Sequence, residues 1–252
     1  MALVQDQAIC VRVWDWSETS QTMLLLTRGL GLVRAVAKGA KRANSSFSGG
    51  VEAMTRGEIV VSTRAMEKPG QHLATLASWD LVETFPQTRR LLDAYYAGVV
   101  MLDLVQHGLH DADPHPEVFD ALVESLREAC EGGRDKASVL KFAWNLLSLT
   151  GHAPEIAADV LTGEVLPAAE SYSFLPRRGG FTRDGTNPVG ELVWRARDAT
   201  RQTLLRIANG DRVEQDETCI RAMKLMLSYF REVHQCDPAG VRMVLGESDA
   251  SR

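Results

Sequence analysis

The spacing of the apolar residues changes once along this chain, at Phe85 and Pro86, and the change separates two kinds of structure. Before it, apolar and polar residues alternate in short runs divided by glycine and polar turns, a pattern that predicts β-strands. After it, apolar residues recur every three or four positions, which predicts amphipathic helices. The sequence therefore indicates an α+β protein of more than one domain, with the strands first.

Five runs before Phe85 have the length and the apolar content of strands. They cover residues 8–14, 23–27, 32–37, 57–64 and 72–82. The third and fourth runs are separated by residues 39–50, a loop rich in Gly, Ala, Ser and Asn. Five short strands with a loop inserted after the third are typical of an OB-fold barrel, which we expect to occupy residues 1–82.

Helical periodicity fills residues 83–151 and predicts a compact bundle of three helices. Gly132 and Gly133 separate the second helix from the third, and Gly151 closes the third. Glycine is a common residue just beyond a helix end, because it adopts a left-handed backbone at little cost. This segment is therefore expected to form a second domain.

Residues 152–252 begin with a stretch in which periodicity is lost and proline and glycine are frequent. We expect irregular structure there, with short strands around Val165 and Phe181. Two further helices, with apolar faces over residues 193–207 and 220–233, are expected to pack on the bundle.

Charge is distributed unevenly along this acidic chain, whose formal net charge is −5. Residues 1–80 carry nine Lys and Arg against seven Asp and Glu, whereas residues 81–252 carry nineteen against twenty-six. A polyanion-binding role would therefore belong mainly to the N-terminal third.

A basic tract lies between Glu18 and Glu52, a span that contains no acidic residue. Its five cations are Arg28, Arg34, Lys38, Lys41 and Arg42. Cations on a strand and its following loop predict a surface that tracks phosphates, and the alternative is an ordinary solvated loop.

Aromatic residues accompany this tract. Trp14 shares a strand face with Arg12, and Phe47 follows the loop. Beside cations, such rings offer platforms on which bases stack, and packing in the core is the alternative for each ring.

Several motifs of catalysis and metal binding are missing. The four cysteines form no Cys-x-x-Cys, and no phosphate-binding loop or nucleophile elbow occurs. His107, His110 and His115 cluster at a helix end, where solvated side chains are a simpler account than a metal site. No apolar run approaches the length of a membrane span. We expect no enzymatic activity, no cofactor, no metal, no small-molecule substrate and no membrane partner.

Four stretches resemble motifs of the RecO family of bacterial recombination mediators. They are WDWSETSQTMLLLTR at residues 14–28, LGLVRAVAKGAKR at 30–42, DLVETFP at 80–86 and GHAP at 151–154. Phe47 lies where that family places an aromatic residue after the loop. The resemblance is most specific over residues 7–90.

The resemblance implies an OB barrel, a helical bundle and a small C-terminal region packed on the bundle. It implies binding of single- and double-stranded DNA, annealing of complementary strands, and help in loading the recombinase onto strands coated by single-strand binding protein. The implied partners are the tail of that protein and RecR, and the implied location is the cytoplasm, at the nucleoid. The implied DNA contacts are Arg12, Trp14, Arg28, Arg34, Lys38, Lys41, Arg42 and Phe47.

One departure from the family concerns zinc. Many members carry a module with four cysteines after the Gly-x-x-Pro, but residues 131–218 of this chain contain no cysteine. We therefore expect a degenerate module without metal in this region.

Two further basic sets each allow two roles. Arg177, Arg178 and Arg183 lie in a glycine-rich loop and either extend the DNA path or keep the loop solvated. A second set, expected to hold an acidic partner tail or else to pair with neighbouring carboxylates, comprises Arg127, Arg134, Lys136 and Lys141. Two other functions stay open at this point: an OB-fold module that binds RNA, and a scaffold that binds protein.

Overall fold

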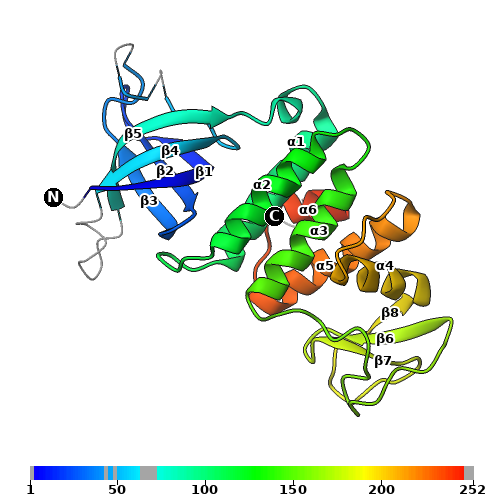
Figure 1. Cartoon of the computed structure of the whole chain (residues 1–252). Coiled ribbons are helices and arrows are strands. Elements are labelled where there is room, and N and C mark those ends of the chain that lie inside the picture. The colour runs from blue at the N-terminus through cyan, green and yellow to red at the C-terminus, as the bar shows by residue number, and fades with distance from the viewer. Residues whose placement is uncertain (1–2, 43–44, 48–49, 63–72, 247–252) are drawn as a thin grey trace.

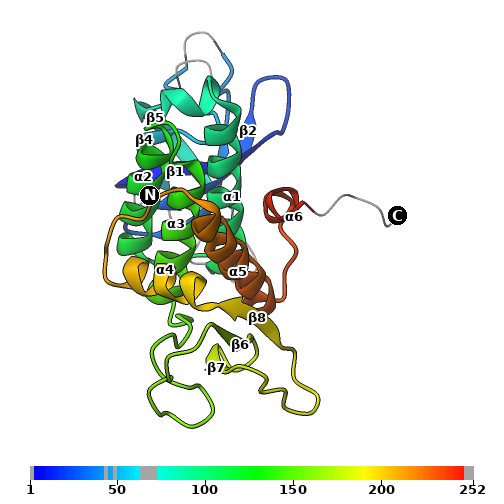
Figure 2. The ribbon, with the colours of Figure 1, turned by 90° about the vertical axis from the view of Figure 1, so that its right-hand side faces the viewer.

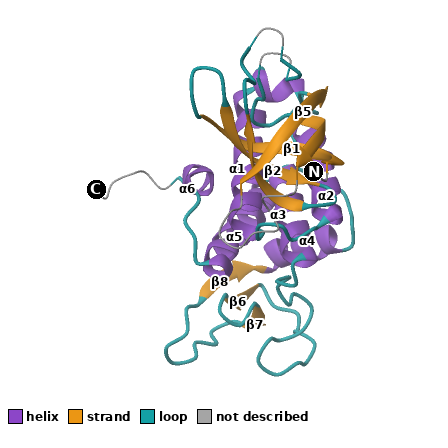
Figure 3. Cartoon of the chain, turned by 90° about the vertical axis from the view of Figure 1, so that its left-hand side faces the viewer, coloured by secondary structure: helices purple, strands orange, loops and turns teal. Residues whose placement is uncertain are grey.

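The computed structural model describes residues 3–42, 45–47, 50–62 and 73–246. A barrel lies at one end of the molecule, a small sheet lies at the other, and helices fill the space between them (Figure 1). Figure 3, seen from the barrel side, shows the barrel strands in front of the helices and the small sheet below them.

Five strands close into a barrel in the order β1-β2-β3-β5-β4. Their bounds are β1 Leu3–Asp15, β2 Gln21–Thr27, β3 Gly31–Ala37, β4 Arg56–Ser62 and β5 Leu73–Glu83. Neighbours pair antiparallel except β3 and β5, which pair parallel. The five-stranded barrel predicted from the sequence is confirmed; residues 63, 64 and 72 of the expected strands lie outside the described residues.

The strand β2 is buried on both faces, which explains its unbroken apolar run. Met23 and Leu25 belong to the core inside the barrel, whereas Leu24 and Leu26 belong to the core shared with the helices. Successive residues of a strand point to opposite faces, so one run supplies two cores. The barrel and the bundle therefore share a continuous apolar core.

The bundle is formed by α1 Leu92–Gly108, α2 Pro116–Ala129 and α3 Asp135–Leu149, and the 3-10 helix η2, Pro86–Arg89, leads into it. The apolar stripe of α1 begins with residues that the core does not cover. Leu92 and Tyr95 are exposed, whereas Val100 and Leu104 are fully buried. The first turn of α1 thus presents apolar surface near the barrel.

The C-terminal region contains a three-stranded sheet of order β7-β6-β8 and three helices. The bounds are β6 Ser171–Leu175, β7 Gly180–Arg183, β8 Trp194–Arg197, α4 Asp198–Ala208, α5 Glu217–His234 and α6 Ala239–Leu245.

The expected strand around Phe181 is present as β7, but two other expectations for this region are wrong. Val165 forms only an isolated bridge with Ala158. The helix expected over residues 193–207 begins at Asp198, because the four residues before it pair with β6 as a strand. A run as short as Trp194–Arg197 fits both the alternation of a strand and the three- or four-residue spacing of a helix, so its pattern alone does not decide between strand and helix.

An aromatic cluster forms the core of the small sheet. Phe174 on β6 contacts Phe181 edge to face at 4.9 Å, Tyr229 of α5 edge to face at 5.4 Å, and the stacked ring of Trp194 at 5.9 Å, all between ring centroids. Each large ring buries much apolar surface, and such geometries add to the gain from burial. Packed rings hold this sheet on the helices.

Candidate nucleic-acid interface

The start of β3 is clamped against the loop that joins α1 to α2. The amide of Ala112 donates to the carbonyl oxygen of Leu32 at 2.9 Å. Gly31 adopts a φ of +75°, and a Cβ there would lie 2.3 Å from the carbonyl oxygen of Asp113. Glycine is required at this position because the two backbones approach too closely for a side chain.

Two cations of the basic tract bridge the barrel to the helices beside this clamp. The guanidinium of Arg28 donates two hydrogen bonds to Asp120 of α2, at 3.0 and 2.9 Å, and they hold the pKa of that carboxyl below its ordinary value. Arg34 donates to Asp111 at 3.0 Å. Both arginines already have carboxylate partners, so a phosphate would have to displace those partners.

Arg12 forms a third bridge, to the buried carboxylate of Asp103 on α1, at 2.5 Å. The other oxygen of Asp103 accepts a hydrogen bond from the amide of Gly240 in α6 at 2.8 Å. This one carboxylate therefore joins the barrel, the bundle and the last helix.

The other cations of the tract lie at the far end of β3, in the turn over residues 38–42. The amide of Gly39 donates to the hydroxyl of Ser20 at 3.2 Å, and the amide of Lys41 donates to the carbonyl of Thr19 at 3.1 Å. The 38–42 turn thus lies against the β1–β2 turn, which stands out from the barrel as a dark blue loop (Figure 2).

The three cations of the 38–42 turn differ in their partners. Lys41 pairs with Asp15 at 2.5 Å. Lys38 and Arg42 are exposed, and neither has an ion-pair partner within the part of the chain that the structure describes. Gly39 between them has a φ of +69°, a left-handed conformation that glycine adopts at little cost.

The aromatic residues predicted near the tract divide between surface and core. Trp14, at the end of β1, is 46% exposed, whereas Phe47 is 4% exposed and packs in the barrel core. The expectation that Phe47 offers a stacking platform is therefore corrected, since its ring has no free face. Sequence reasoning missed Trp16, which is 68% exposed in the β1–β2 turn; a tryptophan within a polar turn was the available signal.

A cleft of about 440 Å³ lies where the barrel meets the bundle, beside Trp14. Its walls include Arg12 and Trp14 from β1, Met54, Arg89 of η2 and the half-exposed ring of Tyr95 on α1. Tyr95 belongs to the apolar stripe of α1, and its exposure shows that this stripe extends into the junction. The cleft and the β1–β2 turn form one surface that carries aromatic and cationic groups; we call it the barrel-tip surface.

All four cations expected to hold a partner tail are paired within the molecule. Arg127 donates to both oxygens of Glu83 at 2.8 Å, and these bonds hold the pKa of Glu83 below its ordinary value. Arg134 pairs with Glu128, Lys136 with Asp135 at 3.1 Å, and Lys141 with Glu124 at 2.7 Å. The alternative foreseen for this set, pairing with neighbouring carboxylates, is what the structure contains.

The second DNA set is also largely paired. Arg178 donates to Glu191 at 2.9 Å and Arg183 to Glu164 at 3.0 Å. Arg177 is exposed and has no ion-pair partner among the described residues.

The residues present do not fit the zinc module that the family resemblance brings to mind. Among the described side chains, no three of His, Cys, Asp and Glu are grouped so that they could hold a metal. The small sheet instead has the aromatic cluster around Phe174 as its core. Within the described ranges, no helix has the length and apolar character needed to cross a membrane.

Comparison with known proteins gives matches along nearly the whole chain. The family model for the N-terminal part of recombination protein O matches residues 1–85, and the model for its C-terminal part matches residues 89–235. The DNA repair protein RecO of Rhodopirellula baltica is 30% identical over 200 residues, 77% of this chain and 73% of that protein. The RecO proteins of Symbiobacterium thermophilum and an Azoarcus species are 30% and 28% identical, over 84% and 96% of this chain and 82% and 95% of theirs.

Proposed function

Because the chain belongs to the RecO family of DNA repair proteins, we propose that it is a non-enzymatic mediator of recombination that binds single-stranded DNA at the barrel-tip surface. One observation carries the proposal: Trp14 and Trp16 are exposed beside a turn whose Lys38 and Arg42 have no carboxylate partner among the described residues. Exposed rings and unpaired cations together suit unstacked bases and their phosphates.

The paired arginines have a different role in this proposal. Arg12, Arg28 and Arg34 fix the barrel to the helices through Asp103, Asp120 and Asp111. In each pair the cation neutralises a carboxylate and not a phosphate. We infer that these three arginines position the barrel-tip surface and contribute little to DNA affinity.

The finer activities follow from the family and are proposals for this chain. We propose that it also binds double-stranded DNA, anneals complementary strands and helps recombinase load onto strands coated by single-strand binding protein, in the cytoplasm at the nucleoid. The proposed protein partners are RecR and the tail of single-strand binding protein. For that tail we propose the surface of Arg127, Arg134, Lys136 and Lys141, where its carboxylates would exchange with those of Glu124 and Glu128.

The barrel-tip proposal is tested by anisotropy of a fluorescein-labelled single-stranded oligonucleotide titrated with the full chain. Trp16→Ala is expected to weaken binding roughly 5- to 150-fold, since stacking on one ring contributes about 1–3 kcal/mol. Trp16→Phe keeps an aromatic face and serves as the matched variant, with near-native affinity expected. Equal affinity of the alanine variant and the native chain would contradict the proposal.

Two controls separate the alternatives. Val165→Ala removes another exposed apolar side chain, far along the sequence, and should leave DNA affinity unchanged. Competition between matched DNA and RNA strands shows which nucleic acid the chain prefers, because discrimination between them needs a contact to the 2′-hydroxyl. Tighter binding of the RNA strand would make the chain an RNA-binding module instead.

A further inference from the structure

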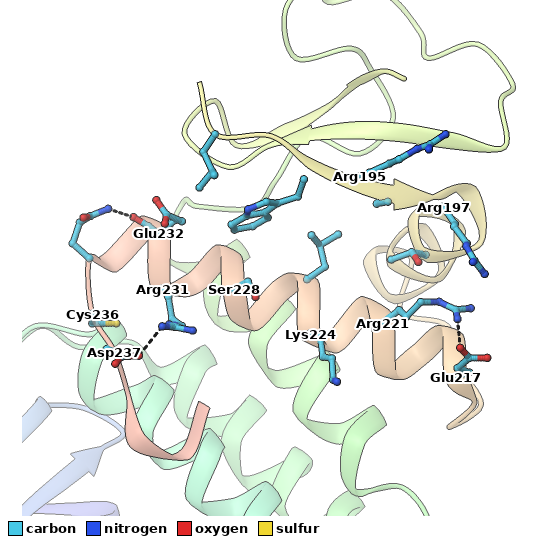
Figure 4. Close-up of a pocket in the computed structure, with 16 residues that line it drawn as sticks. Arg195, Arg197, Glu217, Arg221, Lys224, Ser228, Arg231, Glu232, Cys236 and Asp237 are labelled. Carbon is cyan, nitrogen blue, oxygen red and sulfur yellow. Dashed lines mark hydrogen bonds and ion pairs between the residues drawn. The ribbon is translucent and has the colours of Figure 1, made fainter. Parts of the chain in front are cut away.

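A groove of about 1010 Å³ runs between β8 and α5, at the end of the bundle opposite the barrel (Figures 1 and 4). Among the described strands, β8 is an edge of the small sheet, because the order is β7-β6-β8. One wall of the groove is therefore a sheet edge and the other is the polar face of a helix.

The helical wall is a stripe with one residue every three or four positions. Its members are Glu217, Arg221, Lys224, Ser228 and Arg231. Residues at this spacing lie on one face of a helix. The opposite face of α5, which includes Met223, Met226 and Phe230, is buried in the core. The stripe thus faces the groove because the apolar face faces the bundle.

The strand wall presents its cations by alternation. Trp194 stacks on Phe174, and Ala196 is buried. Arg195 points to the other side of the strand, toward Asp184, whereas Arg197, at the end of β8, is exposed and lines the groove. Both walls therefore contribute guanidinium or ammonium groups to one groove.

Some of these cations are already paired. Arg221 pairs with Glu217 at 2.5 Å, Arg231 with Asp237 at 2.9 Å, and Arg195 with Asp184 at 2.7 Å. Arg197 and Lys224 are exposed and have no ion-pair partner within the described ranges.

Positive charge is unequal along the groove. Figure 4 shows Arg197, Arg221 and Lys224 toward one end, where Glu217 pairs with Arg221. The other end holds Arg231, Glu232 and Asp237. This cationic half stands out because residues 81–252 as a whole are acidic.

We propose that the cationic half of this groove binds the phosphate backbone of a nucleic-acid strand, as a second site separate from the barrel-tip surface. A strand carries one negative charge per nucleotide in a regular row, which matches cations placed along two facing walls. The competing occupant is an acidic peptide added to the edge of β8; the membership of the chain in a DNA repair family favours nucleic acid.

The proposal has a direct consequence. The barrel-tip surface and the β8–α5 groove lie at opposite ends of the helical bundle (Figure 1). One chain would then hold two nucleic-acid segments at once, and short oligonucleotides should saturate the native chain at two per molecule.

The test uses the full chain and a labelled oligothymidylate short enough to occupy one site. In Arg197→Gln/Lys224→Gln the saturating ratio should fall from two to one. Lys38→Gln/Arg42→Gln provides a background in which the barrel-tip site is weakened. When the groove pair is also removed in this background, the negative slope of log K against log salt should become shallower by about 1.4, at roughly 0.7 per phosphate contact. Measuring both backgrounds separates failure of this site from failure of the barrel-tip site.

The control is Arg206→Gln/Arg212→Gln, which removes two exposed cations outside the groove and should keep a ratio of two. If the double groove variant does not fold, Lys224→Gln alone should make the negative salt slope shallower by about 0.7. An unchanged ratio and slope in a folded groove variant would overturn the proposal. So would binding of polyglutamate that requires Arg197 and Lys224 while the DNA ratio stays at two.

Discussion

Two arginines on the barrel and two cations in the C-terminal groove are similar residues in different surroundings. On the barrel, Arg28 and Arg34 lie against the helices and each has a carboxylate partner there. In the groove, Arg197 and Lys224 are exposed without such partners among the described residues. A cluster of cations in the sequence is therefore not yet a binding surface, because the fold decides which charges are left for a ligand.

The two sheets at the ends of the molecule differ in how they are held on the helices. The barrel closes on itself and shares its core with the bundle through Leu24 and Leu26. The three-stranded sheet has open edges and depends on the rings around Phe174. We infer that the barrel end is anchored by many small contacts, whereas the small sheet depends on a few large ones.

The largest expected effect is at the centre of the aromatic cluster. Phe174→Ala should lower the free energy of unfolding by about 3–5 kcal/mol, because it leaves a cavity against three other rings. Leu149→Ala, at a side chain that is 42% exposed, should change stability by less than about 0.5 kcal/mol. Thermal unfolding of both variants checks this, and similar melting temperatures would show that the rings do not hold the sheet.

The next effect concerns the carboxylate that joins barrel, bundle and α6. Asp103→Ala should cost about 2–3 kcal/mol, since Arg12 and the amide of Gly240 both lose a charged acceptor. Asp103→Asn keeps the shape and one acceptor and should cost less. Denaturant unfolding measures both; a loss no greater than for an exposed pair would mean that the junction does not depend on Asp103.

Acid should act on two groups of the molecule at different pH values. Burial, with the neighbouring histidines at 152, 110 and 107, lowers the pKa of His234 to about 4. Its Nε2 is buried and has no hydrogen-bond partner among the described residues. The unfolded state then binds more protons than the folded state below pH 6.5, so stability falls as the pH drops from 6.5 toward 4, by about 2 kcal/mol in this partly hydrated site.

The barrel junction should respond at lower pH. The depressed pKa of Glu83 gives stability that is present above about pH 4.5 and is lost as the pH falls through the lower folded value. In His234→Phe the loss between pH 6.5 and 4 should disappear while the loss below 4.5 stays. Fluorescence of the tryptophans against pH follows both, and an unchanged upper transition in the variant would contradict the assignment to His234.

Local pattern was enough to predict much of the fold. Alternation before Phe85 and helical spacing after it predicted the barrel and the bundle. The short strand β8 was missed because a run of four residues fits the spacing of a strand and that of a helix equally well.

The site was harder to predict, because the ion-pair partners of its cations are distant in the sequence. The partners of Arg28 and Arg34 lie 92 and 77 residues away, and no local pattern shows which surface charge an arginine will meet. The sequence left Phe47 open between stacking and packing, and it lies in the core, whereas Trp16 lies in a polar turn and is exposed. Composition located the basic tract, but only the packing of barrel on bundle separates its anchoring cations from its available ones.

The most direct test compares the salt dependence of single-stranded DNA binding in two variants that each lose two cations of the same tract. Lys38→Gln/Arg42→Gln should make the negative slope of log K against log salt shallower by about 1.4, because these cations are available to phosphates. Arg28→Gln/Arg34→Gln should leave the slope within experimental error of the native value, because these cations already neutralise Asp120 and Asp111. The opposite result, with the slope made shallower only in the second variant, would contradict the account.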